Sequence, residues 1–447
     1  MLTTILINTL CRRPSWRTVC PSRLTSSRLR PLPTRIRPFS SAAKAPLIDP
    51  SYLVEEETNP WYDPRDFYPV QIGGVLNSRY HVIGKLGYGA YSTVWLCRDL
   101  TEHRHVAVKV CVRNYSVTVK RELEAAHHLS NLPETDHPGR CFLRRLLDSF
   151  ELVPKHAETS HSEDSVAARP FQCLVYEPMA MSAVGCRRFS PGGLLSLSLT
   201  RFLTEAILFV VDYLHRHAEL VHTDIQERNI LIGINDPAAF KAFEDREQTD
   251  PTPRKLASDR TIYLSRTVFF KGKPGRPALS DFGEARFGQK VYTGVIQPVQ
   301  YRAPEVVFGM PWDEKVDIWS IGVMMWDMVE GKNLFRVAEN AAAETEPAYD
   351  EYLAHIVSLI GPPPLDFLER CDPERTSKYF DAHANWIGAA SLPEDSLEKS
   401  AKRLEGEMKA KFLDFIRRTV AWKPEDRPSS LELLRHPWVG RIREALP

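Results

Sequence analysis

Two polar side chains, five residues apart, could carry out catalysis within residues 221–232. Asp224 is followed by Asn229 and then by an apolar run, which places both residues on a loop that leads into a strand. A carboxylate can accept a proton from a hydroxyl group, and an amide oxygen can bind Mg²⁺. A second carboxylate, Asp281, lies in an Asp-Phe-Gly tripeptide and could bind the same metal ion. Asp and Asn also form ordinary turns, so neither match identifies a site when taken alone.

A glycine-containing turn and a lysine could bind phosphate groups. Gly87 and Gly89 lie between two predicted strands, and a glycine backbone can approach phosphate oxygens closely. Lys109 lies on a predicted buried strand, where an ammonium group needs a negative partner. Glu122, on the next predicted helix, and the phosphates of a nucleotide are both candidate partners. A plain hairpin turn and a lysine that reaches water from an edge strand are the alternatives.

The elements that must position these residues follow two different periodicities. Short segments rich in Val, Tyr and Trp predict strands at 80–86, 92–99, 105–113 and 171–176. Apolar residues at spacings of three and four predict a helix over 117–132. Helical patterns dominate beyond Pro178, and the pattern over 316–330 is apolar on all sides, which indicates a buried helix.

The chain therefore divides into a short leader, a lead-in and two lobes of an α+β fold. Residues 1–45 form the leader, and residues 46–78 form an acidic, aromatic and proline-rich lead-in. The pattern predicts a small strand-rich lobe over 79–177 and a larger helical lobe over 178–439. The stretch at about 236–276 is polar and contains proline, and Thr261-Ile262-Tyr263-Leu264-Ser265 within it could add a strand.

Composition excludes some classes of protein. The 447 residues are 43% hydrophobic, which is enough for a sizeable core. No apolar run reaches 18 residues, so we expect no transmembrane segment. Residues 1–48 hold nine basic side chains and no acidic one, which leaves 49 basic and 57 acidic residues in the remainder. That acidic remainder argues against direct nucleic-acid binding and is compatible with a basic substrate, although ordinary solvated charge would look the same.

The leader and the cysteines indicate in which cellular compartment the protein resides. Residues 1–45 are rich in Arg, Ser and Thr, and Arg37-Pro38-Phe39-Ser40-Ser41 resembles the cleavage end of a mitochondrial transit peptide. A disordered basic tail or a wrongly assigned start codon is the alternative. None of the eight cysteines has zinc-site spacing, so we expect reduced thiols in an intracellular protein.

Further motifs in a fixed order complete the pattern of a protein family. Ala303-Pro304-Glu305, Asp317-Ile318-Trp319 and Arg427 follow the segments described above. The ordered set resembles a eukaryotic protein kinase, from about residue 77 to residue 439. His222-Thr223-Asp224-Ile225 and the stretch Leu76-Asn77-Ser78-Arg79-Tyr80 are similar to SR-protein kinases, which phosphorylate serines in Arg/Ser-rich proteins. Within that group the chain most resembles the short fungal SR-kinase-like proteins.

The resemblance implies a bilobal fold with ATP and Mg²⁺ in the cleft, acting as a monomeric serine/threonine kinase on a protein substrate that could be rich in Arg and Ser. Nucleus or cytoplasm is then the alternative to mitochondria. Asp224 would be the base, and Asn229 and Asp281 would hold Mg²⁺. Lys109 would contact the α- and β-phosphates and pair with Glu122. The resemblance adds further nucleotide-binding residues, with Tyr176 as gatekeeper: Leu86, Gly87, Gly89, Ser92, Val94, Glu177 and Met179. It also implies a buried ion pair between Glu305 and Arg427.

The chain departs from the usual kinase pattern in three places. Gln226 replaces the lysine that normally neutralises charge on the moving phosphoryl group, which predicts slow turnover. Thr223 replaces the arginine that normally pairs with a phosphate on the activation segment, so we expect activity without phosphorylation of Tyr292 or Thr293. The third departure is an insert at about residues 236–276, because a compact kinase needs only roughly a dozen residues between Asn229 and Asp281. A pseudokinase that binds but scarcely transfers phosphate is the main alternative, and a small-molecule phosphotransferase is the other.

Overall fold

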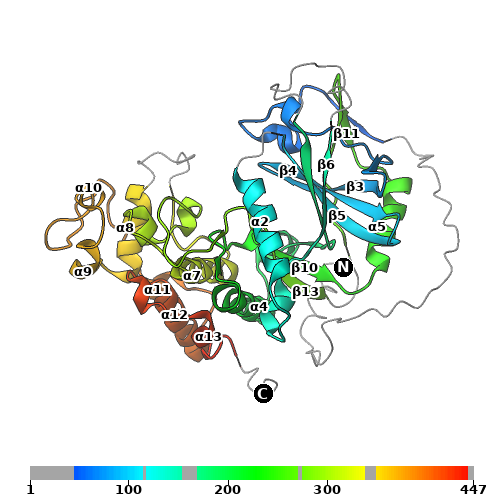
Figure 1. The fold of residues 1–447 in the computed structure, drawn as a ribbon. Coiled ribbons are helices and arrows are strands. Elements are labelled where there is room, and N and C mark those ends of the chain that lie inside the picture. Colours follow the sequence, from blue (N-terminus) through cyan, green and yellow to red (C-terminus); the bar gives the residue numbers. More distant parts are fainter. Residues whose placement is uncertain (1–44, 114–116, 154–168, 270–273, 338–348, 441–447) are drawn as a thin grey trace.

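The computed structural model describes residues 45–113, 117–153, 169–269, 274–337 and 349–440. The described chain forms a sheet-based lobe and a helical lobe, joined after residue 176 (Figure 1). Residues 1–44 of the predicted leader lie outside the described residues. None of the helices found in the described ranges is long and apolar enough to cross a membrane.

A six-stranded antiparallel sheet forms the smaller lobe, and it contains all four predicted strands. Its strands lie in the order β2 (Val75–Leu76), β3 (Tyr80–Gly89), β4 (Ser92–Asp99), β5 (Arg104–Cys111), β7 (Phe171–Tyr176) and β6 (Leu146–Leu152). Strand β6 was not predicted, because its residues are mostly half-buried and do not alternate clearly. Helix α2 (Val117–Asn131) matches the predicted helix and buries Val119 in a cluster with Leu174 and Tyr176 of β7.

Long helices build the larger lobe: α4 (Leu197–Arg216), α7 (Lys315–Glu330), α8 (Tyr349–Ile360) and α12 (Gly406–Thr419). Shorter helices complete it: α3 (Ala183–Arg188), α6 (Pro304–Val307), α9 (Leu365–Leu368), α10 (Pro373–Thr376), α11 (Leu397–Ser400) and α13 (Ser430–Leu433). Helix α7 is buried from Val316 to Val329, as its apolar pattern predicted. Gly322 lets α12 approach closely, because a Cβ there would lie 2.3 Å from Oγ1 of Thr419.

Two small sheets hold the loops that carry the predicted catalytic residues. Strand β10 (Ile230–Ile234) pairs with β13 (Pro274–Leu279) and with β8 (Met181–Ser182). Strand β9 (Leu220–Val221) pairs with β14 (Arg286–Phe287). The Asp224 loop thus runs from β9 through the 3₁₀ turn η7 (Glu227–Asn229) to β10, and the Asp281 loop runs from β13 to β14. Because the two loops share both sheets, their side chains must lie close together.

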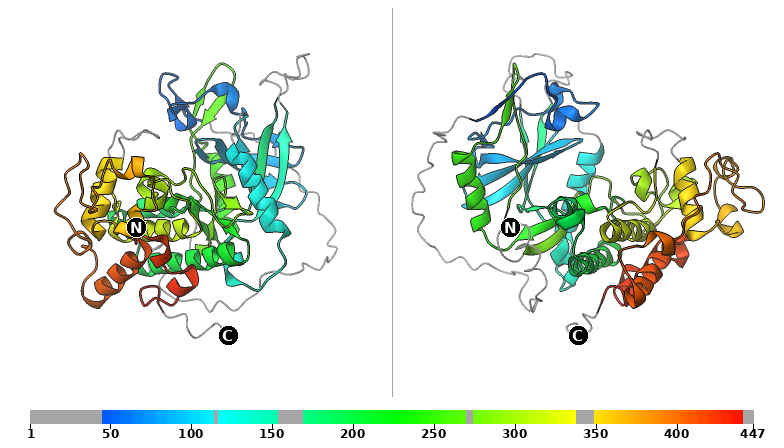
Figure 2. Two further views of the ribbon diagram at one scale, coloured as in Figure 1. Left: turned by 60° about the vertical axis from the view of Figure 1, so that its left-hand side comes forward. Right: turned by 180° about the vertical axis from the view of Figure 1, so that it is seen from behind.

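The insert packs on the smaller lobe, although it follows β10 of the larger lobe in sequence. It forms helix α5 (Ala238–Thr249) and strands β11 (Arg254–Leu256) and β12 (Thr261–Tyr263), so the predicted extra strand is present. Strand β1 (Leu47–Ile48) of the lead-in joins β11 in parallel, giving a three-stranded sheet. Figures 1 and 2 show this sheet and α5 beside the six-stranded sheet, away from the helical lobe.

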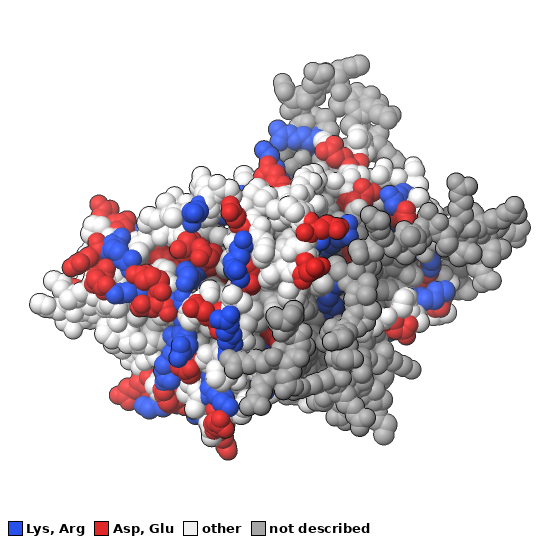
Figure 3. All heavy atoms as spheres, turned by 60° about the horizontal axis from the view of Figure 1, so that its bottom comes forward, with Lys and Arg blue, Asp and Glu red and all other residues white. Residues whose placement is uncertain are grey.

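The surface of the helical lobe is mixed in charge. On the face drawn in Figure 3, lysine and arginine side chains alternate with aspartate and glutamate side chains. Remaining 3₁₀ turns connect the longer elements: η1 (Glu55–Thr58), η2 (Pro64–Asp66), η3 (Pro138–Phe142), η6 (Pro191–Gly193), η8 (Val299–Tyr301) and η10 (Pro424–Asp426).

Candidate active site

A carboxylate of the buried helix α7 supports the loop that carries Asp224. The backbone N–H groups of His222 and Thr223 each donate a hydrogen bond to the carboxylate of Asp317, at 2.8 Å. Thr223 adopts a φ of 65°, a left-handed conformation that is costly for a β-branched residue. The two charge-assisted hydrogen bonds help to keep the loop in this conformation. Asp317 lies in a sequence motif noted above, but its role as the support of this loop was not predicted.

Asp224 is bonded by both of its predicted neighbours. Nδ2 of Asn229 donates to a carboxylate oxygen and to the backbone oxygen of Asp224, each at 2.8 Å. Nε2 of Gln226 donates to the other carboxylate oxygen at 2.6 Å. Burial, followed by the charge of Asp281, raises the pKa of Asp224 to about 7. A carboxylate with such a pKa can accept a proton near neutral pH.

Asp281 lies beside the predicted lysine, on a loop that is bonded to the loop of Asn229. Oδ1 of Asp281 is 3.6 Å from Nζ of Lys109, and the charge of Lys109 lowers the pKa of Asp281, whose side chain is 47% exposed. Backbone N–H and hydroxyl of Ser280 both donate to the carbonyl of Asn229, at 2.9 and 3.0 Å, so the two metal-ligand loops are bonded together. The amide nitrogen of Asn229 is used on Asp224, which leaves its amide oxygen for a cation. The donor set of one amide and one carboxylate oxygen suits Mg²⁺.

Lys109 is paired with Glu122 of helix α2, as the resemblance implied. Nζ of Lys109 lies 2.6 Å from Oε2 of Glu122, and the hydroxyl of Tyr176 donates to Oε1 at 2.8 Å. Burial alone would lower the pKa of Lys109, but Asp281 and Glu122 outweigh burial and raise it. Strand β5 is central in the sheet, between β4 and β7, so the alternative of an edge-strand lysine is wrong.

The glycine turn is the hairpin between β3 and β4, where Gly87 pairs with Val94 and Gly89 pairs with Ser92. A Cβ at Gly87 would meet no atom within 4 Å, and one at Gly89 would meet only the Ser92 hydroxyl, at 3.7 Å. Neither glycine has a positive φ. Neither packing nor backbone conformation therefore requires a glycine at these two positions. A phosphate group against the loop would require one, because a larger side chain would occupy its place. The turn therefore leaves room for a phosphate group.

The remaining predicted nucleotide-binding residues lie at the junction of the lobes. Leu86 and Val94 flank the glycine turn and are half-buried, as is Met179 just after β7. The side chain of Glu177 is 54% exposed and lies 3.9 Å from Arg276 of β13. Half-buried apolar side chains are suitable for a flat base, and the exposed Glu177 could contribute only its backbone to such a pocket.

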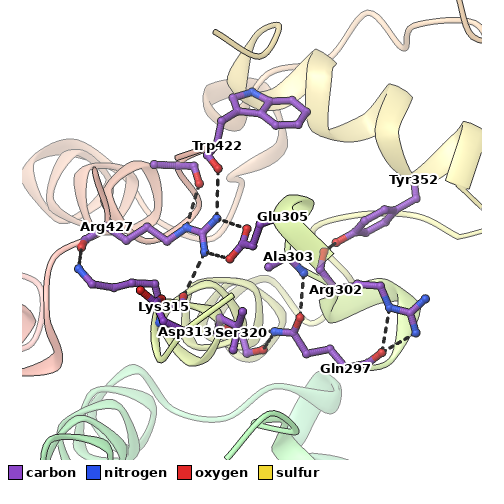
Figure 4. A network of polar contacts seen from close by, with 12 residues as sticks. Gln297, Arg302, Ala303, Glu305, Asp313, Lys315, Ser320, Tyr352, Trp422 and Arg427 are labelled. Carbon is purple, nitrogen blue, oxygen red and sulfur yellow. Dashed lines mark hydrogen bonds and ion pairs between the residues drawn. The ribbon is translucent and has the colours of Figure 1, made fainter. Parts of the chain in front are cut away.

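The predicted ion pair between Glu305 and Arg427 anchors the end of the activation segment, which runs from residue 281 to residue 305, to the helical lobe. Two guanidinium nitrogens of Arg427 donate to the two carboxylate oxygens of Glu305, at 2.7 and 2.8 Å, and both side chains are buried (Figure 4). The same guanidinium also donates to the backbone oxygens of Lys315, Ala421 and Trp422. These contacts use all five N–H donors of the guanidinium group, which explains how Arg427 can be buried.

Thr223 bonds directly to the activation segment. Its hydroxyl donates to the carbonyl of Glu284 at 2.6 Å, so a neutral hydrogen bond ties the catalytic loop to this segment. Tyr292 is buried, its ring stacks on Trp312 at 5.0 Å, and its hydroxyl accepts from the N–H of Gln289. Thr293 is exposed. The segment is therefore ordered by packing and hydrogen bonds between unmodified side chains.

Comparisons with known proteins agree with this geometry. The protein kinase domain family profile matches residues 80–439. A serine/threonine protein kinase of Aspergillus fumigatus is 39% identical over 398 residues, which cover 88% of this chain and 93% of the relative. The serine/threonine-protein kinase SRPK of Physarum polycephalum is 26% identical and covers 87% of this chain and 92% of the relative. A crystal structure of a kinase domain superposes with a TM-score of 0.62 at 24% identity, over 84% of this chain and all of that chain.

The match to the profile spans most of the chain, and it runs through every element that holds the catalytic loops. The relatives that cover nearly the whole chain are named serine/threonine kinases. Both findings agree with a lysine–glutamate pair that lies beside Asp281 and with the hydrogen-bonded pair of Asn229 and Asp224. This chain belongs to the protein kinase family, in its serine/threonine branch.

Proposed function

We propose that the chain is an active kinase that transfers the γ-phosphate of Mg-bound ATP to serine or threonine hydroxyls of protein substrates. One observation carries the proposal: Nζ of Lys109 lies 2.6 Å from Glu122 and 3.6 Å from Asp281. The proposed phosphate-binding lysine is therefore already placed between helix α2 and the proposed metal ligand. A site that had lost its chemistry would have no reason to keep Lys109 and Glu122, two largely buried charges, beside Asp281, because buried charges are costly.

Each side chain has a distinct role in this proposal. Asp224 orients the acceptor hydroxyl and accepts its proton at a carboxylate oxygen. Asn229 and Asp281 would hold Mg²⁺, and Lys109 would hold the phosphates, while bound Mg–ATP supplies the phosphoryl group. Gln226 donates a hydrogen bond to Asp224 but carries no charge, so we expect slower turnover than a lysine would give.

Arg/Ser-rich proteins are the substrate class that we propose. The relative named SRPK and the acidic balance of residues 49–447 support it, because acidic surfaces attract basic peptides. The test compares an Arg/Ser-repeat peptide with a peptide of the same length in which glutamate replaces arginine. Preferential labelling of the basic peptide is expected, and equal or better labelling of the acidic peptide would exclude this substrate class.

A radiolabelled-ATP assay with three proteins tests the enzymatic activity. Wild type and Glu407→Gln, a change at an exposed ion pair far from the site in sequence, should label the peptide equally. Asp224→Ala should lose at least about a hundredfold in rate. Equal labelling by wild type and Asp224→Ala would refute the activity. The pseudokinase alternative predicts ATP binding in a fluorescent-nucleotide titration without labelling above that of Asp224→Ala.

We propose mitochondrial import as well, on the strength of the nine basic and no acidic side chains in residues 1–48. Nucleus or cytoplasm is the alternative that the family resemblance favours. Imaging of the full chain and of a chain without residues 1–45 tests import, and an unchanged distribution would refute it. We also propose a monomer, for which light scattering should give a mass near 51.0 kDa.

A further inference from the structure

A lysine with no exposed surface lies beside the phosphate-binding turn and has no role in the chemistry described above. Lys85 is on β3, two residues before Gly87, and its side chain is 0% exposed. Its ammonium group pairs with Glu56, lies 3.3 Å from Oε2 of Glu55, and donates to the carbonyl oxygen of Tyr263 at 3.1 Å. An ammonium group is buried in this way only where several negative or dipolar groups compensate for the lost water.

The three partners of Lys85 come from outside the two lobes. Glu55 and Glu56 belong to the lead-in, and Tyr263 belongs to strand β12 of the insert. Lead-in and insert are also bonded to each other, because Glu55 accepts from the N–H and the hydroxyl of Ser265, at 2.8 and 2.5 Å. Glu55 has a φ of 56°, an unusual backbone conformation for glutamate that these bonds help to hold. Lys85 is thus the point at which lead-in, insert and β3 meet.

The insert holds β3 on either side of Lys85 as well. A Cβ on Gly84 would lie 2.8 Å from the ring of Phe243, so helix α5 packs directly on the strand there. The N–H of Arg266 donates to the carbonyl of Lys85 at 2.9 Å. On the other side, Nζ of Lys85 lies 5.4 Å from the ring of Tyr88, which stands between the two glycines of the turn. The strand is therefore held at the end where the phosphate-binding turn begins.

We propose that lead-in residues 52–57 and insert residues 243–266 form a clamp, and that Lys85 is the positioning residue through which this clamp holds the glycine turn for the phosphates of ATP. The inference rests on the proposed function, because it assumes that the turn binds a nucleotide. A glycine turn makes few side-chain contacts of its own, so its position must be set by the strand that leads into it. Loss of the Lys85 link between the clamp and β3 should loosen the turn without changing Lys109 or Asp281, whereas loss of a bond within the clamp should leave the turn in place.

Two lysine variants of the full chain separate positioning from general stability. Lys85→Met removes the ammonium group beside the turn. Lys255→Met is the matched control, because Lys255 is also a buried lysine that joins lead-in to insert, through Glu57 at 2.8 Å and the carbonyl of Tyr52 at 3.0 Å. Lys255 lies on β11 rather than on β3. Both variants should lower the melting temperature, whereas only Lys85→Met should affect the turn.

Two measurements follow the turn itself. Hydrogen exchange of the amides of residues 86–91, without nucleotide, should be at least about tenfold faster in Lys85→Met and unchanged in Lys255→Met. The dissociation constant for Mg–ATP, from titration with a fluorescent nucleotide analogue, should rise about tenfold in Lys85→Met alone. If Lys85→Met does not fold, Glu56→Gln keeps a hydrogen-bond acceptor at the same place and should give a smaller change in the same direction.

The outcomes distinguish the two proposals. Equal exchange and equal affinity in wild type and Lys85→Met would overturn the proposal, and equal losses in both lysine variants would overturn the role of Lys85 as the residue that links the clamp to the turn. If wild type binds no ATP, the proposed function fails, while the exchange of residues 86–91 still decides whether Lys85 holds the turn.

Discussion

Replacement of Gln226 by lysine would place an ammonium group next to the proposed base. Nε2 of Gln226 lies 2.6 Å from a carboxylate oxygen of Asp224, and the glutamine is 5% exposed. A cation within about 4–6 Å lowers a carboxyl pKa by about 1–3. The pKa of Asp224, which burial and Asp281 raise to about 7, should therefore fall to about 4–6 in Gln226→Lys.

Two consequences should appear in the kinetics. A base works only when it is ionised, so the rate of wild type should fall as pH drops through about 7, and Gln226→Lys should keep its rate to a lower pH. The new charge also faces the transferred phosphoryl group, and transition-state charge stabilisation of this kind changes kcat by about ten- to a thousandfold. We expect a gain near the lower end of this range, because Gln226→Lys also loses the hydrogen bond from the amide to Asp224.

Stability should change with pH in a related way. The pKa of Asp224 is higher in the folded state than its ordinary value of 3.8, so this group stabilises the protein fully only at low pH. Its contribution is lost as pH rises from about 4 through about 7, and Gln226→Lys should reduce that loss. Denaturation at several pH values measures this slope.

The assay is the pH dependence of kcat with saturating Mg–ATP and peptide, for wild type, Gln226→Lys and Gln226→Met. The methionine variant removes the hydrogen bond to Asp224 without adding charge, so it should not shift the acid limb to lower pH. A Gln226→Lys protein with the acid limb and kcat of wild type would refute the reasoning that charge at this position limits the reaction.

Three further changes test the site and its anchor. Glu305→Gln should destabilise the protein by about 3–5 kcal/mol in urea denaturation, since it leaves the buried Arg427 without a carboxylate, whereas the exposed-pair variant Glu407→Gln should leave the stability nearly unchanged; similar losses in both would contradict the anchoring role. Gly87→Ala should keep the melting temperature, because its Cβ meets no atom within 4 Å, but should weaken Mg–ATP binding at least about tenfold; unchanged binding would count against a phosphate at the turn. Thr293→Ala, and wild type treated with phosphatase, should retain full activity in the peptide assay, because the hydroxyl of Thr223 already bonds the catalytic loop to Glu284. A strict requirement for phosphate would disprove activity without phosphorylation.

Much of the chemistry was predictable because it depends on residues that are close in sequence. The spacing of Asp224 and Asn229 on one loop, and the pairing of Lys109 with Glu122, follow from a strand, a helix and the family pattern. The left-handed backbone at Thr223 and its support by Asp317 were not predictable, because α7 supplies that carboxylate from 94 residues further along. The half-buried strand β6 was missed for want of a clear alternation.

The periodicity of the chain indicated two lobes and the loops that carry the carboxylates, and the family resemblance implied the kinase fold and the buried pair of Glu305 and Arg427. Only the tertiary structure shows that the insert packs on the smaller lobe and that Lys85 is buried against Glu56. The reason is physical. Local periodicity reports which face of an element avoids water, whereas the partner of a buried charge is chosen by contacts such as that of Glu55 with Ser265, 210 residues apart.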